Sequence, residues 1–493
     1  MKYDFVIIGA GVSGMTSALL LAKHEHRVAL VEQFRHPAPT LRGFFRQGVY
    51  FDTGLHYTGS FAPGEILDVY FRYLGMTGIE RESYNPDGFD RLLFLNNGQE
   101  FNLPIGYSRM EAYLGELFPQ ERKNIQTYLN AVRDDFDTSP FLNLSRSLSF
   151  DNLTDIPSNT TLAAYLDSLT DNAMLKSVLS MHCMLYGVPP EETPFTNHAK
   201  IVGSYFQSVH GINGGGLSVV RSFEKALKDA DVSLFCGSGV KHILLATDGS
   251  TRGVELENGQ IFEAPKVLCT THPEVLLDLV PEGAFRPAYR RRIRSLRDTP
   301  SAYMLFGIAD GPIDSIENRN LYVCPATDVS SFFRPDRHPE QGPFYVASTA
   351  SAKDNRRGVV AIAPGFAKDA AQWLDSRTGH RPESYSEYKE TNLSAVRKAL
   401  VEAVPELGQV RFVDGATPLT LRDYMQTPTG SLYGSGHSIN QFNPVPGTRI
   451  PGLLLAGQSV VAPGVLGAVV SAFLTCGYII GHERIREELI TCA

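Results

Sequence analysis

The residues with the clearest chemical signature are three glycines near the start of the chain, Gly9, Gly11 and Gly14, in the pattern GxGxxG. Gly9 allows a tight turn, Gly11 lets the backbone approach a pyrophosphate, and Gly14 lets a helix pack closely on a strand. Glu32 follows at about the spacing, roughly 20 residues, at which an acid accepts hydrogen bonds from an adenosine ribose. The pattern predicts a dinucleotide site, for either FAD or NAD. Its predicted contacts are Gly9, Gly11, Val12, Ser13, Gly14, Glu32 and Gln33.

These residues can act together only on a strand–turn–helix–strand unit. The apolar run at residues 3–8 predicts a strand buried on both faces, and the helix-forming residues 15–23 follow the glycines. A second buried strand at residues 27–31 ends on Glu32. The phosphates would lie on the exposed N–H groups at the helix N-terminus. Because strand, glycines, helix, strand and acid occur in this order, a dinucleotide site is favoured over an ordinary glycine turn.

The bulk composition limits the function classes. With 493 residues, of which 43% are hydrophobic, the chain is long enough for two or more lobes. The formal net charge of −8 argues against a nucleic-acid partner. The six cysteines are scattered without a CxxC pair, which favours free thiols in a reducing compartment. A strand that starts at Tyr3 leaves no room for a signal peptide, so cytoplasmic localisation is predicted.

Two other patterns are weak. His182, Cys183 and His198 have poor spacing for a metal and no completing acid, so no metal site is predicted. The uncharged stretch 453–480 is almost long enough to span a bilayer, but glycines and a proline interrupt its first half. It is better interpreted as a buried strand, a glycine turn and a buried helix.

The middle of the chain predicts a second lobe. Helical patterns dominate from about residue 66 to 197, with a hairpin at Asn96-Asn97-Gly98, and residues 294–419 alternate strands and helices. Between them, residues 232–269 return to strand patterns typical of the nucleotide domain. We therefore expect an α/β protein whose Rossmann-type domain is interrupted by an α+β substrate lobe. The predicted nucleotide domain comprises residues 1–70, 200–290 and 420–493, and the lobe comprises residues 71–199 and 291–419.

The C-terminal segment carries a second glycine-marked unit. An apolar strand ends in Ala456-Gly457-Gln458, and Pro463-Gly464-Val465-Leu466-Gly467-Ala468 begins a helix. Together with the N-terminal GxGxxG, this resembles the two-part FAD site of glutathione-reductase-type flavoproteins. The resemblance implies that the second helix directs its positive end at the flavin, and that Gly457, Gln458, Gly467 and Ala468 contact FAD.

More narrowly, the chain resembles the phytoene desaturase, carotenoid isomerase and retinol saturase group, most of all the retinol saturases. The similar segments are residues 51–59 (FDTGLHYTG), 185–187, 214–216, 431–437 and 453–476. Two places depart from that group. Pro37-Ala38-Pro39 stands where the group has a Gly-Gly pair, leaving Gly43 with Arg42 beside it, and Ser459 stands where the related motif often has an acid.

The resemblance implies an FAD-dependent oxidoreductase that acts on C=C bonds of an apolar polyene or isoprenoid. Saturation, desaturation and isomerisation share this apparatus, and NADH or NADPH, if it is the reductant, has no domain of its own. The alternatives are a reductive or cyclising tailoring enzyme for a polyene natural product, an amine oxidase, and a non-catalytic escort protein for lipidated partners. An escort protein would not need intact phosphate glycines. An apolar substrate is compatible with peripheral membrane contact, and the sequence leaves the oligomeric state open.

Four side chains are candidates for a catalytic role. His56 and Tyr57 follow a predicted strand end near the flavin, and Tyr433 and His437 lie on a glycine-rich loop before the second helix. His56 and Tyr57 could donate a proton or simply form the wall of the site, whereas Tyr433 and His437 could lie near the flavin ring or be solvent-exposed loop residues. Arg42 could pair with the pyrophosphate or lie at the surface. Val240 begins a strand whose backbone would contact the adenine.

Overall fold

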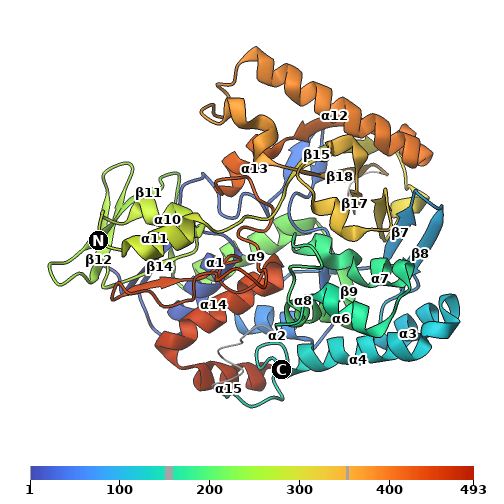
Figure 1. Cartoon of the computed structure of the whole chain (residues 1–493). Helices are drawn as coiled ribbons and strands as arrows, with labels where there is room; N and C mark the ends of the chain where they lie inside the picture. The colour runs from blue at the N-terminus through green and yellow to red at the C-terminus, as the bar shows by residue number, and fades with distance from the viewer. Residues whose placement is uncertain (1, 150–158, 351–354) are drawn as a thin grey trace.

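The computed structural model describes residues 2–149, 159–350 and 355–493 (Figure 1). Its first sheet has five parallel strands in the order β10–β2–β1–β14–β20. Their bounds are β1 Phe5–Ile8, β2 Val28–Glu32, β10 Ser233–Cys236, β14 Lys266–Cys269 and β20 Leu453–Leu455. Both faces are covered: Phe5 and Ile7 belong to one apolar cluster, and Val6 and Ile8 to another. This explains why the strands are continuously apolar in sequence.

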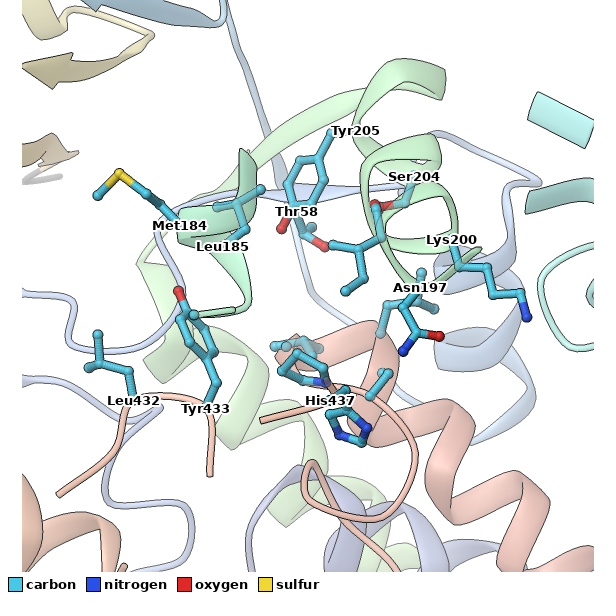
Figure 2. A pocket seen from close by; sticks show the side chains of 18 of the residues that line it. Thr58, Met184, Leu185, Asn197, Lys200, Ser204, Tyr205, Leu432, Tyr433 and His437 are labelled. Carbon is cyan, nitrogen blue, oxygen red and sulfur yellow. The ribbon is translucent and has the colours of Figure 1, made fainter. Parts of the chain in front are cut away.

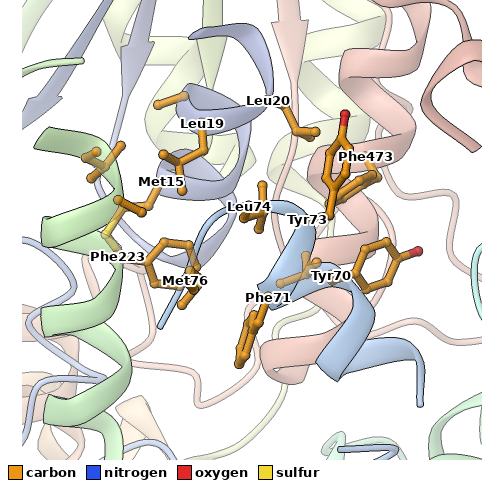
Figure 3. Packing of buried hydrophobic residues seen from close by; sticks show 14 of the residues in the cluster. Met15, Leu19, Leu20, Tyr70, Phe71, Tyr73, Leu74, Met76, Phe223 and Phe473 are labelled. Carbon is orange, nitrogen blue, oxygen red and sulfur yellow. The ribbon is translucent and has the colours of Figure 1, made fainter. Parts of the chain in front are cut away.

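Helices cover one face of this sheet, and a small antiparallel sheet covers the other. The helical side is built from α1 Val12–Lys23, α2 Ile66–Tyr73, α9 Gly215–Asp229, α14 Gly464–Ile480 and α15 His482–Cys492. The other side has β11 Val240–Leu245, β12 Thr251–Leu256, β13 Ile261–Glu263, α10 Pro273–Leu279 and α11 Pro287–Arg294. Figure 3 shows Met15 and Leu19 of α1 packed near Phe223 of α9, with α2 alongside. Tyr70 and Phe473 bring their ring centroids within 4.4 Å and so join α2 to α14.

The second main sheet has seven strands in the order β19–β15–β18–β17–β16–β7–β8. Their bounds are β7 Asp90–Phe94, β8 Gln99–Leu103, β15 Ser301–Ala309, β16 Asn320–Cys324, β17 Phe344–Ala350, β18 Arg357–Gly365 and β19 Arg411–Ala416. The β16–β7 pair is parallel and the other pairs are antiparallel. This pair joins an early segment of the chain to a late one. The lobe is therefore assembled from two distant stretches of sequence.

Helices also flank the second sheet. Leu393 and Leu400 of α12 (Glu383–Ala403) pack against it, and the helix runs along it in Figure 1. The other helices of this part are α3 Tyr107–Leu117, α4 Arg122–Thr138, α6 Leu162–Leu169, α7 Ala173–Ser180, α8 Phe195–Gln207 and α13 Pro418–Met425. Short strands connect the two parts: β3 Phe44–Arg46, β4 Val49–Phe51, β5 Thr58–Gly59, β6 Arg81–Ser83 and β9 Val209–Ile212.

The predicted fold class is confirmed, including the β7–β8 hairpin around Asn96-Asn97-Gly98. The predicted domain boundaries fall within the helices α2, α8, α11 and α13. The domain division itself stays a prediction. Among the described residues, no helix combines the length and apolar character needed to cross a bilayer.

Candidate active site

The larger cavity, of about 1170 Å³, lies where the parallel strands end, between the two main sheets. Ile8, Glu32, Thr270 and Ala456 line it from the carboxyl ends of β1, β2, β14 and β20. Ligands of open α/β sheets bind at this edge. The volume slightly exceeds the range of roughly 300–1,000 Å³ typical of small-molecule pockets. It is suited to a ligand as long as a dinucleotide.

The GxGxxG turn forms the floor of this cavity. Gly9 has φ +95°, and a Cβ on it would lie 2.7 Å from the Thr270 hydroxyl. A Cβ on Gly14 would lie 1.9 Å from the Gly9 carbonyl, so helix and turn touch there. By contrast, a Cβ on Gly11 would meet nothing within 4 Å, because Gly11 borders the cavity. α1 begins without a side-chain cap, which leaves its first N–H groups for a phosphate.

Glu32 lies at the predicted ribose position. Its carboxylate accepts hydrogen bonds from the N–H groups of Ala10, at 2.9 Å, and Phe34, at 3.0 Å. Burial raises the pKa of Glu32, and these N–H groups oppose that shift. The two bonds join both ends of the βαβ unit and hold the carboxylate in the cavity wall. Gln33 and Val240 line the same cavity, and their contacts with the cofactor stay predictions.

The second glycine-marked unit meets the first. The Ser13 hydroxyl donates to the Ala468 carbonyl at 2.9 Å, bringing the beginnings of α1 and α14 together. Gly457 and Gln458 line the larger cavity, and Gly467 lines a neighbouring smaller one. Ala468 lines neither cavity, and its carbonyl accepts the hydrogen bond from Ser13. α14 also begins without a side-chain cap, so its positive end is available to the flavin ring.

One predicted contact is wrong: Arg42 does not face the phosphate position. Its guanidinium is 2.5 Å from the Glu224 carboxylate and also donates to the Pro37 carbonyl at 3.3 Å. Arg42 lines neither cavity, whereas the neighbouring Gly43 does line the larger one. Where the resemblance leads one to expect Gly-Gly, Ala38 adopts φ +47° and donates its N–H to the Ala10 carbonyl at 2.9 Å. This loop reaches the cavity without the glycine pair.

The smaller cavity, of about 270 Å³, adjoins the larger one and is mostly apolar. One face of α8 contributes Asn197, Lys200, Ile201, Ser204 and Tyr205, at helical spacing. Figure 2 shows four of these α8 side chains, Asn197, Lys200, Ser204 and Tyr205, on one side and Tyr433 and His437 on another. Seven residues line both cavities: Gly54, His56, Ile362, Leu432, Tyr433, Gly464 and Val465. The two spaces therefore meet at the beginning of α14.

His56 occupies this junction. Among the described residues, its buried Nδ1 atom has no hydrogen-bond partner. Burial lowers the pKa of His56 to about 4, so the imidazole is neutral at pH 7. Tyr57 lines the smaller cavity, and its hydroxyl lies 3.2 Å from the Asp90 carboxylate and 2.9 Å from the Tyr322 hydroxyl. His56 is therefore suited to contact a bound ligand, and Tyr57 belongs to a hydrogen-bonded network.

Tyr433 and His437 belong to the loop before β20. Tyr433 lines both cavities, and burial raises its pKa to about 12. The His437 Nε2–H donates to the Gln458 carbonyl at 2.7 Å, and Nδ1 accepts from the Asn443 amide at 3.3 Å. Both ring nitrogens are thus engaged, and burial lowers the pKa of His437. This arrangement makes His437 a link between two loops of the site.

Four aromatic residues near the site are divided between the cavities and the apolar core. Tyr205 lines the smaller cavity and Phe306 the larger one. Phe206 and Tyr303 line neither cavity and lie in the apolar clusters.

Sequence reasoning missed two buried acid–histidine pairs. His272 Nε2 lies 2.9 Å from Asp298, which also accepts from the Thr429 hydroxyl and so ties the 429–435 loop to the cofactor side. His182 Nε2 lies 2.8 Å from Asp90. The two members of each pair are far apart in sequence, so no spacing pattern predicts that they meet.

His182, Cys183 and His198 are engaged by other side chains. His198 bonds to the hydroxyls of Tyr128 and Tyr186, and the Tyr186 hydroxyl also lies 2.9 Å from Cys183 Sγ. Among the described residues, no group of three or more His, Cys, Asp or Glu side chains is placed to hold a metal ion.

Comparison with known proteins agrees with this geometry. Residues 12–480 match the family described as flavin containing amine oxidoreductase. Over 99% of this chain and 88% of the relative, the sequence is 24% identical to an all-trans-retinol 13,14-reductase of Danio rerio. It is 21% identical to a 4,4'-diapophytoene desaturase (4,4'-diaponeurosporene-forming) of Staphylococcus aureus, over 64% of this chain and 65% of that one.

A solved oxidoreductase from Methanosarcina mazei has the same fold, with a TM-score of 0.68 at 15% identity over 96% of this chain and 99% of that chain. The glycine turn, the open space beside Gly11 and the two uncapped helix starts fit FAD. The chain therefore belongs to the flavin containing amine oxidoreductase family and is an FAD-dependent oxidoreductase.

Proposed function

We propose that this flavoenzyme reduces a carbon–carbon double bond of an apolar polyene or isoprenoid. The observation that carries the proposal is the mostly apolar cavity that meets the cofactor cavity at His56, Tyr433 and Val465. When bound and reduced, FAD supplies a hydride from ring atom N5. An alkene placed at this junction would lie beside the flavin while its hydrocarbon part remained out of water.

The similarity to relatives named as reductases supports the reductive direction, because it extends over 99% of this chain. The similarity to a relative named as a desaturase covers only 64% of this chain. The chain's own residues would hold the cofactor at Gly11 and Glu32 and cover the substrate with Tyr205 and Leu432. We infer that NADH or NADPH reduces the flavin from solution. Cytoplasmic localisation and peripheral membrane contact stay predictions.

The proposal is tested with an anaerobic flavin spectrum of the purified protein. The spectrum is recorded before and after NADPH, NADH or dithionite, and all-trans-retinol or an acyclic carotene is then added. We expect a nicotinamide to bleach the flavin and the polyene to restore its colour, yielding a product heavier by two hydrogens. Reduction by dithionite alone, with a product that has lost two hydrogens, would indicate a desaturase.

The same preparation also tests two of the alternative functions, an amine oxidase and a non-catalytic binding protein. Hydrogen peroxide released with simple amines, without any polyene product, would indicate an amine oxidase. A protein that retains no flavin after incubation with FAD would contradict the enzymatic proposal and favour a binding protein.

A further inference from the structure

A buried polar network lies behind the smaller cavity. Asp90 on β7 is completely buried, and its carboxylate accepts three hydrogen bonds. The donors are His182 Nε2 at 2.8 Å, the Asn320 amide at 2.7 Å and the Tyr57 hydroxyl at 3.2 Å. Because Tyr57 donates to Asp90, the Tyr322 hydroxyl 2.9 Å away donates to Tyr57. A fully buried acid of this kind requires such donors, since an unpaired buried charge is strongly destabilising.

The network reaches the substrate space on one side only. Tyr57 and Tyr322 both line the smaller cavity, whereas Asp90 and His182 lie behind them and do not. Tyr57 directly follows His56, which lies at the junction with the cofactor cavity. Phenylalanine rings would support the fold equally well in the wall of a mostly apolar cavity. The hydroxyl groups of Tyr57 and Tyr322 at this point therefore need another explanation.

We infer that His182, Asp90 and Tyr57 form a relay that delivers the proton of the reduction. This inference rests on the proposed function. Reduction of an alkene adds a hydride to one carbon, from the flavin reduced by NADH or NADPH, and a proton to the other carbon. Tyr57 gives its hydroxyl proton to the second carbon, whose new C–H bond uses the electron pair of the former π bond. The Asp90–His182 pair then returns a proton to the Tyr57 phenolate, and the proton of the pair is finally replaced from solvent.

The relay accounts for the positions of its members. A tyrosine hydroxyl is a weak acid, and burial beside Asp90 raises the pKa of Tyr57 further. Proton transfer from Tyr57 therefore requires its immediate replacement, and the Asp90–His182 pair is within hydrogen-bond reach to provide it. The other titratable groups that face the pair are the hydroxyls of Tyr84, Tyr205, Tyr322 and Tyr345, together with the imidazole of His198.

The same lobe contains a matched control. The Tyr128 hydroxyl is also buried, donates to the Leu179 carbonyl at 3.2 Å and lies 2.7 Å from His198 Nε2, but neither Tyr128 nor His198 lines a cavity. Tyr57→Phe and Tyr128→Phe thus each remove one buried hydroxyl and keep the ring. A loss of activity that came only from packing would affect both variants.

The experiment separates the two halves of the reaction in the FAD-loaded protein. The flavin is reduced anaerobically with dithionite, and its reoxidation by a polyene is followed at several pH values in H₂O and D₂O. We expect Tyr57→Phe to slow reoxidation by about 10²-fold or more, the usual size of a lost general acid. Tyr128→Phe should stay within about threefold of wild type. Wild-type reoxidation should be slower in D₂O than in H₂O, and Asp90→Asn or His182→Gln should reduce that solvent isotope effect.

Three outcomes would overturn the relay and leave the proposed function in place. Equal reoxidation rates in wild type and Tyr57→Phe would show that Tyr57 gives no proton. A loss seen with a hydroxylated polyene but absent with a hydrocarbon polyene would mean that Tyr57 recognises the hydroxyl group. An equal loss in Tyr57→Phe and Tyr128→Phe, with a lower Tm in both, would mean that the network only supports the fold. If the wild-type flavin is reoxidised by no polyene, the proposed function fails together with the relay.

Discussion

The Ser13 hydroxyl donates a 2.9 Å hydrogen bond to the main-chain carbonyl of Ala468, and so joins two helix starts separated by 455 residues. Both α1 and α14 begin at this point without side-chain caps. Their free N–H groups and positive ends therefore lie close together. Those of α1 are available to a pyrophosphate and those of α14 to the flavin ring. The FAD site is completed only when the two ends of the chain come together.

Ser13→Ala should lower the stability of the FAD-loaded protein by about 1 kcal/mol, the usual net value of one hydrogen bond. FAD should also dissociate faster, because the two helix starts are no longer tied. Ser17→Ala on the same helix is the control, since its buried hydroxyl has no partner among the described residues. Chemical unfolding and flavin release measure both effects. Equal behaviour of the two variants would contradict a role for the Ser13–Ala468 bond.

Alanine substitutions at two glycines of the first turn should affect cofactor binding and folding separately. Gly11 has φ −74° and open space where a Cβ would lie, so Gly11→Ala should fold and fill part of the phosphate position. Gly14→Ala would place a Cβ 1.9 Å from the Gly9 carbonyl and should instead prevent helix α1 from packing. We expect Gly11→Ala to yield colourless protein with a near-normal circular dichroism spectrum. Gly14→Ala should be insoluble or have a much lower Tm. If Gly11→Ala bound flavin as well as wild type does, the pyrophosphate would have to bind away from Gly11.

Asp52 should make stability depend on pH. Its carboxylate accepts from the Gly216 N–H at 2.9 Å and the Leu55 N–H at 3.3 Å, and complete burial raises its pKa to about 7. The native state then binds more protons than the unfolded state between about pH 4 and pH 7, so this group's stabilisation is lost as pH rises through that range. A shift of this size corresponds to at most about 4 kcal/mol.

The measurement is urea unfolding of wild type and Asp52→Asn from pH 4 to pH 8. The variant lacks the titrating carboxyl, so the difference between the two free energies of unfolding should change over this interval and become constant above it. A difference that stays the same at all pH values would contradict the raised pKa.

His437 should support the cofactor and take no part in proton transfer. Its two ring nitrogens bond to the Gln458 carbonyl and to the Asn443 amide. His437→Leu should therefore release FAD more readily and lower the Tm, because it leaves both partners unsatisfied. With saturating FAD, the pH dependence of flavin reoxidation should keep its wild-type shape. A changed pH profile in this variant would instead assign proton transfer to His437.

His56 should act as a neutral contact across the usable pH range. With a pKa lowered by burial to about 4, it should not appear in pH profiles between pH 6 and pH 9. His56→Phe should shift the flavin absorption maxima, because this side chain lies at the junction of the two cavities. An unchanged spectrum, with and without polyene, would place His56 outside contact with either ligand.

The amino-acid sequence by itself determined the nucleotide unit. Continuous apolar runs predict strands buried on both faces, and the glycines of the first turn are required by backbone geometry that few other residues allow. Such constraints act within about 30 residues, so their order along the chain is enough to indicate them. For the same reason the β7–β8 hairpin was predictable.

Only the tertiary structure decided which side chains meet. Arg42 pairs with Glu224 and not with the phosphate position, and Asp90 meets His182 across 92 residues of chain. Side-chain pairing between distant segments depends on how the segments pack, which no local pattern encodes. The junction at His56 likewise exists because α14, from the end of the chain, begins beside a loop from its start. Local sequence specified the cofactor turn, and long-range packing produced the network at the substrate cavity.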